Sequence, residues 1–179
     1  MVRLHFAVLG GFIFLTGSAL ASILVQGAAV VISGDLLTIR GTPFYLRDVD
    51  SFELGQTCWM EKRDVGDCGA KAKESLQLLV AGTLVTCIAP NGTKYGGVIA
   101  MCMTDKGVDI GEEMVRRGWA LVRPDLAGGD AKKLCEIEAE AKKFQRGVWK
   151  YRFALPYLYR GEGGKSAQDV SCGSHPRFP

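Results

Sequence analysis

The chain shows two kinds of hydrophobic pattern, and the first kind predicts strands. Runs of β-branched or alternating apolar residues, typical of half-buried strands, cover 23–33, 36–40 and 43–49. Short pairs that contain glycine separate these runs and are typical of tight turns. Two further runs, 83–89 and 95–103, have the same character on either side of an Asn-Gly turn signal. The pattern therefore predicts five strands.

The second pattern is helical, with apolar residues recurring every three or four positions. It first covers 69–81, where Gly82 follows at the position that ends many helices. A short helix is also expected at 111–117, on different grounds, because two glutamates there each precede an arginine by four residues. A third helix is expected to begin after Asp130, a good capping residue, and to end at Gly147. Its apolar face would consist of Leu134, Ile137, Ala141 and Phe144.

The order of these elements predicts an α+β fold. Three strands, a helix, two more strands and terminal helices follow one another as in a five-stranded OB-fold barrel with three helices. Residues 54–68, which contain two glycines and two aspartates, are expected to form a loop. The segment 161–179 is rich in Gly, Ser and Pro and is predicted to be a flexible tail.

The N-terminus resembles an export signal. Arg3 precedes an apolar run over 6–15, and Ala19-Leu20-Ala21 fits the small-residue cleavage pattern. We therefore expect a signal peptide at 1–21, a domain at 22–160 and a periplasmic or secreted protein. The alternative is an uncleaved membrane anchor, since 23–32 is also apolar. The β-branched residues at 30–32 favour a first strand, which leaves no membrane span after cleavage.

Composition limits the class of protein without choosing a partner. The chain has 179 residues, 47% of them apolar and 23% charged, which suits one compact domain and excludes disorder of the whole chain. A net charge of +3 does not by itself argue for nucleic acid. We expect a monomer.

The six cysteines are better suited to disulfides than to a metal site. They form an even set after the expected signal, and an exported protein meets an oxidising compartment. A Cys-x2-Cys pair is absent from the sequence, and His175 is the only histidine after the signal, which disfavours zinc. Fifteen connectivities are open. Proximity along the chain favours Cys58 with Cys68, Cys87 with Cys102, and Cys135 with Cys172.

Short motifs occur along the chain in a fixed order. Six of them are Ser33-Gly34-Asp35, 44–53, Lys94-Tyr95-Gly96-Gly97, 115–120, 138–141 and 146–149. Two more, each with one cysteine, are Gln56-Thr57-Cys58 and Cys68-Gly69. The order of the six resembles the staphylococcal-nuclease-like (thermonuclease) family, and the two cysteine motifs are similar to those of its exported bacterial members. The resemblance covers about residues 27–160 and implies the OB-fold barrel.

The resemblance implies a calcium-dependent phosphodiesterase site. Asp35 and Asp50 match the family's carboxylate ligands, and Ser51 matches the position whose backbone carbonyl binds calcium. Such hard oxygen ligands are those that Ca²⁺ prefers. Glu53 matches the glutamate that orients the attacking water. The positions of Lys94 and Tyr95 match residues that contact the phosphate and sugar of the nucleotide, although packing would also explain the tyrosine.

The phosphate-binding half of the site departs from the family pattern. Tyr45 and Gly97 stand where the resemblance places two arginines that hold the phosphate. An arginine on developing phosphoryl charge is worth roughly 10³–10⁵ in rate in related chemistry. Arg47 lies two residues after Tyr45, so it shares a strand face and could replace one arginine. The alternative is that Arg47 only covers the rim of the barrel.

Two hypotheses for function follow. In the first, the protein is non-catalytic or weakly active and binds calcium, a polyanion or an envelope protein partner. The polyanion would be a nucleic acid or an anionic polysaccharide. Exported relatives include a protein of succinoglycan (exopolysaccharide) biosynthesis, so the resemblance suggests a role in the cell envelope. In the second, the protein is a secreted Ca²⁺-dependent nuclease of DNA or RNA. The double loss of arginine favours the first.

Overall fold

The structure, a computed structural model, describes residues 23–60, 63–89, 93–94, 97–123, 131–161 and 172. The expected signal peptide, the Asn-Gly turn, the Asp130 cap and most of the expected tail lie outside the described residues. Within the described part, the chain forms eleven strands, four α-helices and one 3-10 helix. The α+β class is therefore observed, with more strands and helices than the five and three expected.

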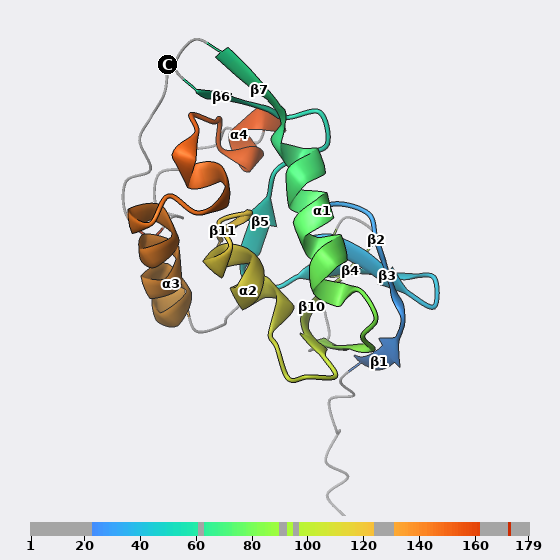
Figure 1. The fold of residues 1–179 in the computed structure, drawn as a ribbon. Helices are drawn as coiled ribbons and strands as arrows, with labels where there is room; N and C mark the ends of the chain where they lie inside the picture. Colours follow the sequence, from blue (N-terminus) through green and yellow to red (C-terminus); the bar gives the residue numbers. More distant parts are fainter. Residues whose placement is uncertain are drawn as a thin grey trace, which may run out of the picture.

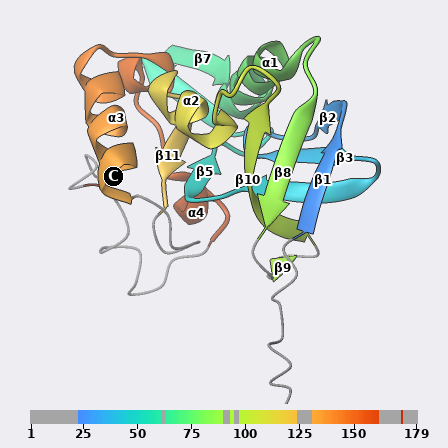
Figure 2. The same cartoon turned by 90° about the horizontal axis from the view of Figure 1, so that it is seen from below.

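Seven strands form one curled, mixed sheet in the order β1-β8-β10-β4-β3-β2, with β9 paired to β10. β4 and β10 pair in parallel, and the other pairs are antiparallel. β1 and β2 stand at opposite ends of this order, yet one residue separates them in sequence. The sheet therefore curls until its ends approach, as in a barrel (Figures 1 and 2). The bounds are β1 Ile23–Gly27, β2 Ala29–Val31, β3 Leu36–Ile39, β4 Thr42–Leu46, β8 Val85–Ala89, β9 Thr93–Lys94 and β10 Gly97–Thr104.

Two of the expected strands are each divided in the structure. The run 23–33 becomes β1 and β2, because the chain passes there from one end of the sheet to the other. The run 43–49 is interrupted at Asp48, whose φ of 63° is left-handed. After this residue the chain continues as β5 (Val49–Ser51), which pairs with β11 (Ala120–Val122) outside the main sheet. Only Ala28 separates β1 from β2, so hydrophobicity does not mark the first break, whereas the charged pair Arg47-Asp48 stands at the second.

The expected loop at 54–68 is wrong in part, because it contains a hairpin. β6 (Thr57–Met60) and β7 (Arg63–Asp67) pair antiparallel, with a register shift after Cys58. The β7 sequence is Arg-Asp-Val-Gly-Asp, which has none of the apolar alternation that identifies a half-buried strand. Main-chain pairing and the disulfide from Cys58 to Cys68 define the hairpin instead.

The first two helices are confirmed to within one residue at each end. α1 covers Cys68–Val80 and α2 covers Ile110–Arg116. Each begins at an aspartate whose carboxylate accepts a backbone N–H three residues later, Asp67 for α1 and Asp109 for α2. Such caps satisfy donors that the helix itself leaves unpaired.

The C-terminal part contains more helix than the pattern predicts. α3 covers Ala131–Lys143, and Phe144 follows it with 57% of its surface exposed instead of joining the buried face. Gly147 begins the 3-10 helix η1 (Gly147–Lys150), and α4 (Pro156–Tyr159) is a further short helix. In both views α2 and β11 lie between α3 and the curled sheet (Figures 1 and 2).

Two apolar clusters hold these layers together. The larger fills the inside of the curled sheet and continues under α1 and α2. The smaller lies at the end of the sheet where β5 and the hairpin meet residues 151–160, which we call the C-terminal segment. Its buried members are Phe52, Cys58, Cys68, Leu121, Val148 and Phe153. Phe52 of this cluster lies between Asp50 and Glu53 in sequence, so its packing helps to position these two carboxylates.

Candidate functional site

Asp35 lies in the turn between β2 and β3 and is held from two sides. The hydroxyl of Ser33 donates to its Oδ1 at 2.7 Å, and the backbone N–H of Ser51 donates to its Oδ2 at 3.2 Å. A Cβ on Gly34 would lie 2.0 Å from the Ser51 hydroxyl oxygen, so only glycine lets the turn approach β5 this closely. Burial raises the pKa of Asp35, and the two hydrogen bonds oppose that rise.

Asp50 is a buried carboxylate that faces two arginines. It lies in the middle of β5 and is 3% exposed. Arg160 forms a bidentate contact with it, donating from Nη1 to Oδ1 at 2.9 Å and from Nη2 to Oδ2 at 3.1 Å. Arg123 approaches the same Oδ2 at 3.4 Å. Burial raises the pKa of Asp50, and the hydrogen bonds from Arg160 lower it.

Glu53 completes a group of three carboxylates. Its Oε1 accepts a short hydrogen bond from Arg160 Nη1, the same nitrogen that contacts Asp50. The charge of Glu53 raises the pKa of Asp35, and the charge of Asp35 raises that of Asp50, so the three groups are electrostatically close. The structure thus brings Asp35, Asp50 and Glu53 together.

Ser51 is buried beside this group. Its hydroxyl donates to the carbonyl oxygen of Trp119 at 2.7 Å, and its amide is the donor to Asp35. The side chain therefore links β5 to the residue before β11. Lys94 lies in β9, and Tyr95 lies outside the described residues.

Tyr45 and Gly97 are neighbours across the parallel pair β4 and β10. The pairing sets Tyr45 opposite Ile99, two residues after Gly97. A Cβ built on Gly97 would lie 2.8 Å from Cε2 of the Tyr45 ring. The ring therefore occupies the space that any side chain at position 97 would need, and the two residues are matched to each other.

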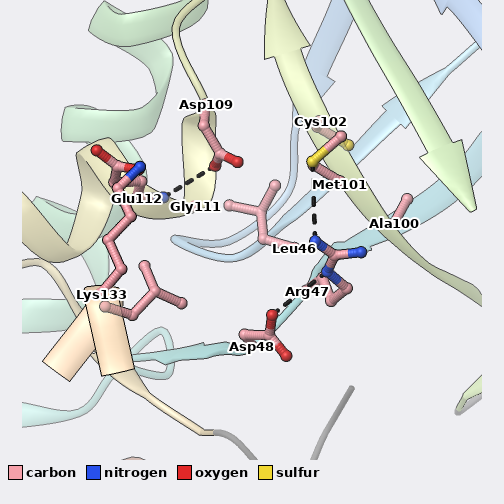
Figure 3. Close-up of a pocket in the computed structure, with 11 residues that line it drawn as sticks. Leu46, Arg47, Asp48, Ala100, Met101, Cys102, Asp109, Gly111, Glu112 and Lys133 are labelled. Atoms are coloured by element: carbon pink, nitrogen blue, oxygen red, sulfur yellow. Dashed lines mark hydrogen bonds and ion pairs between the residues drawn. The ribbon is translucent and has the colours of Figure 1, made fainter. Parts of the chain in front are cut away.

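Arg47 lies on the side of the sheet that faces α2. Its Nε forms an ion pair with Asp48 at 3.3 Å, and one terminal nitrogen lies 3.8 Å from the sulfur of Met101. It lines a pocket whose other wall carries Glu112 and Lys133, as Figure 3 shows. Arg47 thus contacts Asp48 and Met101 of this pocket.

Arg160 and Arg123 were not predicted from the sequence. Arg160 follows α4, and Arg123 follows β11, with its guanidinium 5.0 Å from the centre of the Tyr157 ring. Arg160 lies 110 residues from Asp50 in sequence and 107 from Glu53. No local spacing connects residues so far apart, and none of the quoted motifs contains either arginine.

The cysteines pair as proximity along the chain favours. Disulfides join Cys58 to Cys68 and Cys87 to Cys102, and a third joins Cys135 in α3 to Cys172. Within the described residues, no group of three or more His, Cys, Asp or Glu side chains is arranged to hold a metal ion. No helix in that same part of the chain is long and apolar enough to cross a membrane.

The fold and the sequence define a class. The family model described as "Staphylococcal nuclease homologue" matches residues 44–151, which is more than half of the chain. The protein therefore belongs to the staphylococcal nuclease homologue family, and its curled mixed sheet with packed helices is compatible with that fold.

The chain is also similar to one protein whose name gives a biosynthetic pathway. The chain is 28% identical over 140 residues to the succinoglycan biosynthesis protein ExoI of Rhizobium meliloti (strain 1021). The alignment covers 77% of this chain and 71% of that protein.

Proposed function

We propose that this protein has little or no phosphodiesterase activity and acts in exopolysaccharide biosynthesis in the cell envelope. The proposal retains the nuclease fold as a scaffold. Its ligand would be a polyanion, and an anionic polysaccharide presents spaced negative charges much as a nucleic acid does. Fold alone does not decide function, which depends on the residues of the site.

The contact between Tyr45 and Gly97 carries the proposal. The family resemblance places phosphate-binding arginines at these two positions. In this chain one position has no side chain and the other has a ring that fills the vacated space. The neutral phenol of a tyrosine cannot form the bidentate hydrogen bonds that a guanidinium makes to phosphate. Transition-state charge would therefore be left without its main stabilising groups.

Two further observations support the location and the pathway. Three disulfides are typical of proteins in oxidising compartments, which agrees with the signal-peptide pattern at 1–21 and with a periplasmic or secreted protein. The similarity to a succinoglycan biosynthesis protein favours exopolysaccharide over nucleic acid.

A nuclease assay on the disulfide-intact protein tests the catalytic half of the proposal. Single-stranded DNA and RNA are incubated with the wild type, with calcium and with a chelator. We expect no cleavage above that of the Glu53→Gln variant. Calcium-dependent cleavage that Glu53→Gln abolishes would overturn the proposal in favour of a secreted nuclease.

The paired substitution Tyr45→Arg with Gly97→Arg is the matched gain-of-function variant. In the Arg160→Gln background, where Asp50 and Glu53 no longer contact that guanidinium, we expect it to raise hydrolysis above that of Arg160→Gln alone, because it restores both phosphate-binding guanidinium groups. Gly97→Arg alone should instead destabilise the fold, since its Cβ would meet the Tyr45 ring.

Binding to an anionic polysaccharide, with a neutral polysaccharide as control, tests the proposed ligand. Equal affinity for both would contradict the proposed ligand class.

A further inference from the structure

The three carboxylates already have a positively charged partner, the guanidinium of Arg160. Its two terminal nitrogens contact both oxygens of Asp50, and one of them also contacts Glu53. Three of the four carboxylate oxygens of Asp50 and Glu53 thus accept from one side chain. The guanidinium is permanently charged and its planar shape matches this arrangement.

Both carboxylate oxygens of Asp35 also accept hydrogen bonds. One of its oxygens accepts from the hydroxyl of Ser33 and the other from the amide of Ser51. Calcium takes six to eight oxygen ligands at about 2.3–2.6 Å. A divalent ion at such distances from Asp50 and Glu53 would also lie against the Arg160 guanidinium and be repelled by it. The calcium ion that the family resemblance implies therefore does not fit the described arrangement.

The C-terminal segment holds Arg160 in this place through contacts with β6 and with the turn before it. Trp59 of β6 exchanges two backbone hydrogen bonds with Arg152, at 2.9 and 2.7 Å. Gln56 donates to the carbonyl of Ala154 at 2.7 Å, and the rings of Phe52 and Phe153 meet edge to face at 5.2 Å. These contacts anchor the chain a few residues before the arginine.

The end of the segment is fixed as well. Tyr157 is 7% exposed and packs its ring against Arg123, which itself contacts Asp50. The amide of Arg160 bonds to the carbonyl of Pro156 at 3.0 Å, so Arg160 closes the turn of α4. The Arg160 side chain is 27% exposed, which places it within the site and not in open solvent.

We propose that Arg160 acts as an internal cation that takes the place of calcium at this site, so that calcium binds only when Arg160 is displaced. Arg160 lies beyond residue 151, where the family match ends. The C-terminal segment would thus make the site independent of the calcium concentration. This inference is compatible with the proposed function but rests on different contacts.

Calcium binding by the complete, disulfide-intact protein tests the inference without any measurement of hydrolysis. Isothermal titration with calcium compares the wild type, Arg160→Gln and the control Arg116→Gln. The control removes the same charge from α2, where Arg116 pairs with Glu112 and Glu113. We expect binding only by Arg160→Gln, with a Kd on the order of 10⁻⁴–10⁻³ M. Its Tm should rise by about 3 °C in calcium at roughly ten times that Kd.

Two results would overturn the inference. One is a wild type that binds calcium as tightly as Arg160→Gln. The other is a folded Arg160→Gln that binds no calcium, since the arginine would then occupy no cation position. If Arg160→Gln does not fold, Arg160→Met removes the charge but keeps a long apolar side chain at the same place. It should bind calcium in the same range, and a folded Arg160→Met that binds none would overturn the inference.

The outcomes distinguish the two proposals. Calcium-dependent cleavage by the wild type would contradict both, because it needs calcium at the site. Equal affinity for anionic and neutral polysaccharides would contradict only the proposed function. Calcium binding in the wild type, without cleavage, would contradict only the role assigned to Arg160.

Discussion

Glu138 is a carboxylate buried where α3 packs against β11. It is 2% exposed, and its Oε1 accepts the backbone N–H of Val122 at 2.8 Å. Burial raises the pKa of Glu138 to about 7, and the hydrogen bond from Val122 opposes that rise. The folded protein therefore holds this proton at pH values where the unfolded chain has already lost it.

This difference predicts that stability falls as pH rises from about 4.5 to about 7. The folded state binds the proton more tightly, so raising the pH through that window lowers the free energy of unfolding by about 3 kcal/mol. Glu138→Gln keeps an acceptor for Val122 but does not ionise. We expect it to match the wild type near pH 4.5 and to exceed it by about that amount at pH 8. Urea unfolding across this range measures the difference.

Glu136→Gln is the matched control on the same helix. Glu136 is exposed, so its substitution should leave the pH dependence of unfolding unchanged. Parallel pH profiles for the wild type and Glu138→Gln would show that Glu138 is ionised in the folded protein and that its pKa is not raised.

The residues of the candidate site were predictable to different degrees. Asp35, Asp50 and Glu53 stand in short motifs, and the structure brings all three together. Arg160 was not predictable, because its partners lie more than a hundred residues earlier and its contact depends on how the C-terminal segment packs. Spacing along the sequence carries information about neighbours on one element, and contacts between elements need the fold.

At the scale of elements, amphipathic helices were predictable and polar elements were not. α1 shows apolar periodicity, α2 carries two Glu–Arg pairs at a spacing of four residues, and in each an aspartate caps the N-terminus. The hairpin of β6 and β7 has no such signal, since main-chain bonds and a disulfide hold it. α4 has only four residues, too few for a 3.6-residue period to emerge.

Gln56 is the side chain that joins the start of the hairpin to the C-terminal segment. It is 1% exposed, accepts from the amide of Glu53 at 3.0 Å and donates to the carbonyl of Ala154 at 2.7 Å. Gln56→Ala leaves both backbone groups without this partner, which should cost about 2–4 kcal/mol of stability. Urea unfolding gives the cost, and hydrogen exchange at Trp59 and Arg152 should show faster local opening.

The exposed Gln77 of α1 provides the comparison. Gln77→Ala removes the same side chain where it is exposed, and it should change stability by less than about 0.5 kcal/mol. If Gln56→Ala unfolds no more easily than Gln77→Ala, the hydrogen bonds of Gln56 do not fasten the C-terminal segment.

At the scale of the whole molecule, the disulfides secure the curled sheet, the hairpin and the last long helix. Cys87 and Cys102 stand directly opposite each other on β8 and β10, and both are buried. Their bond closes a loop with a sequence separation of 15. In the chain-entropy account, a loop of this size stabilises the fold by about 3 kcal/mol.

The paired substitution Cys87→Ala with Cys102→Ala should therefore lower the Tm by about 10 °C. Calorimetry of the oxidised variant beside the oxidised wild type measures this loss. Peptide mapping of the wild type without reductant verifies that the pair is joined. An unchanged Tm in the variant, with the wild-type bond verified, would mean that the curled sheet does not depend on this link.

The distance along the chain between Arg160 and its carboxylates also affects how the molecule is made. A ribosome that adds about 5–20 residues per second needs about 5 to 20 seconds to pass from Asp50 to Arg160, 110 residues later. The acidic group is therefore synthesised before both of its arginines, and Arg123, 73 residues after Asp50, is added before Arg160. The contact with Arg160 can form only after nearly all of the described chain has been made.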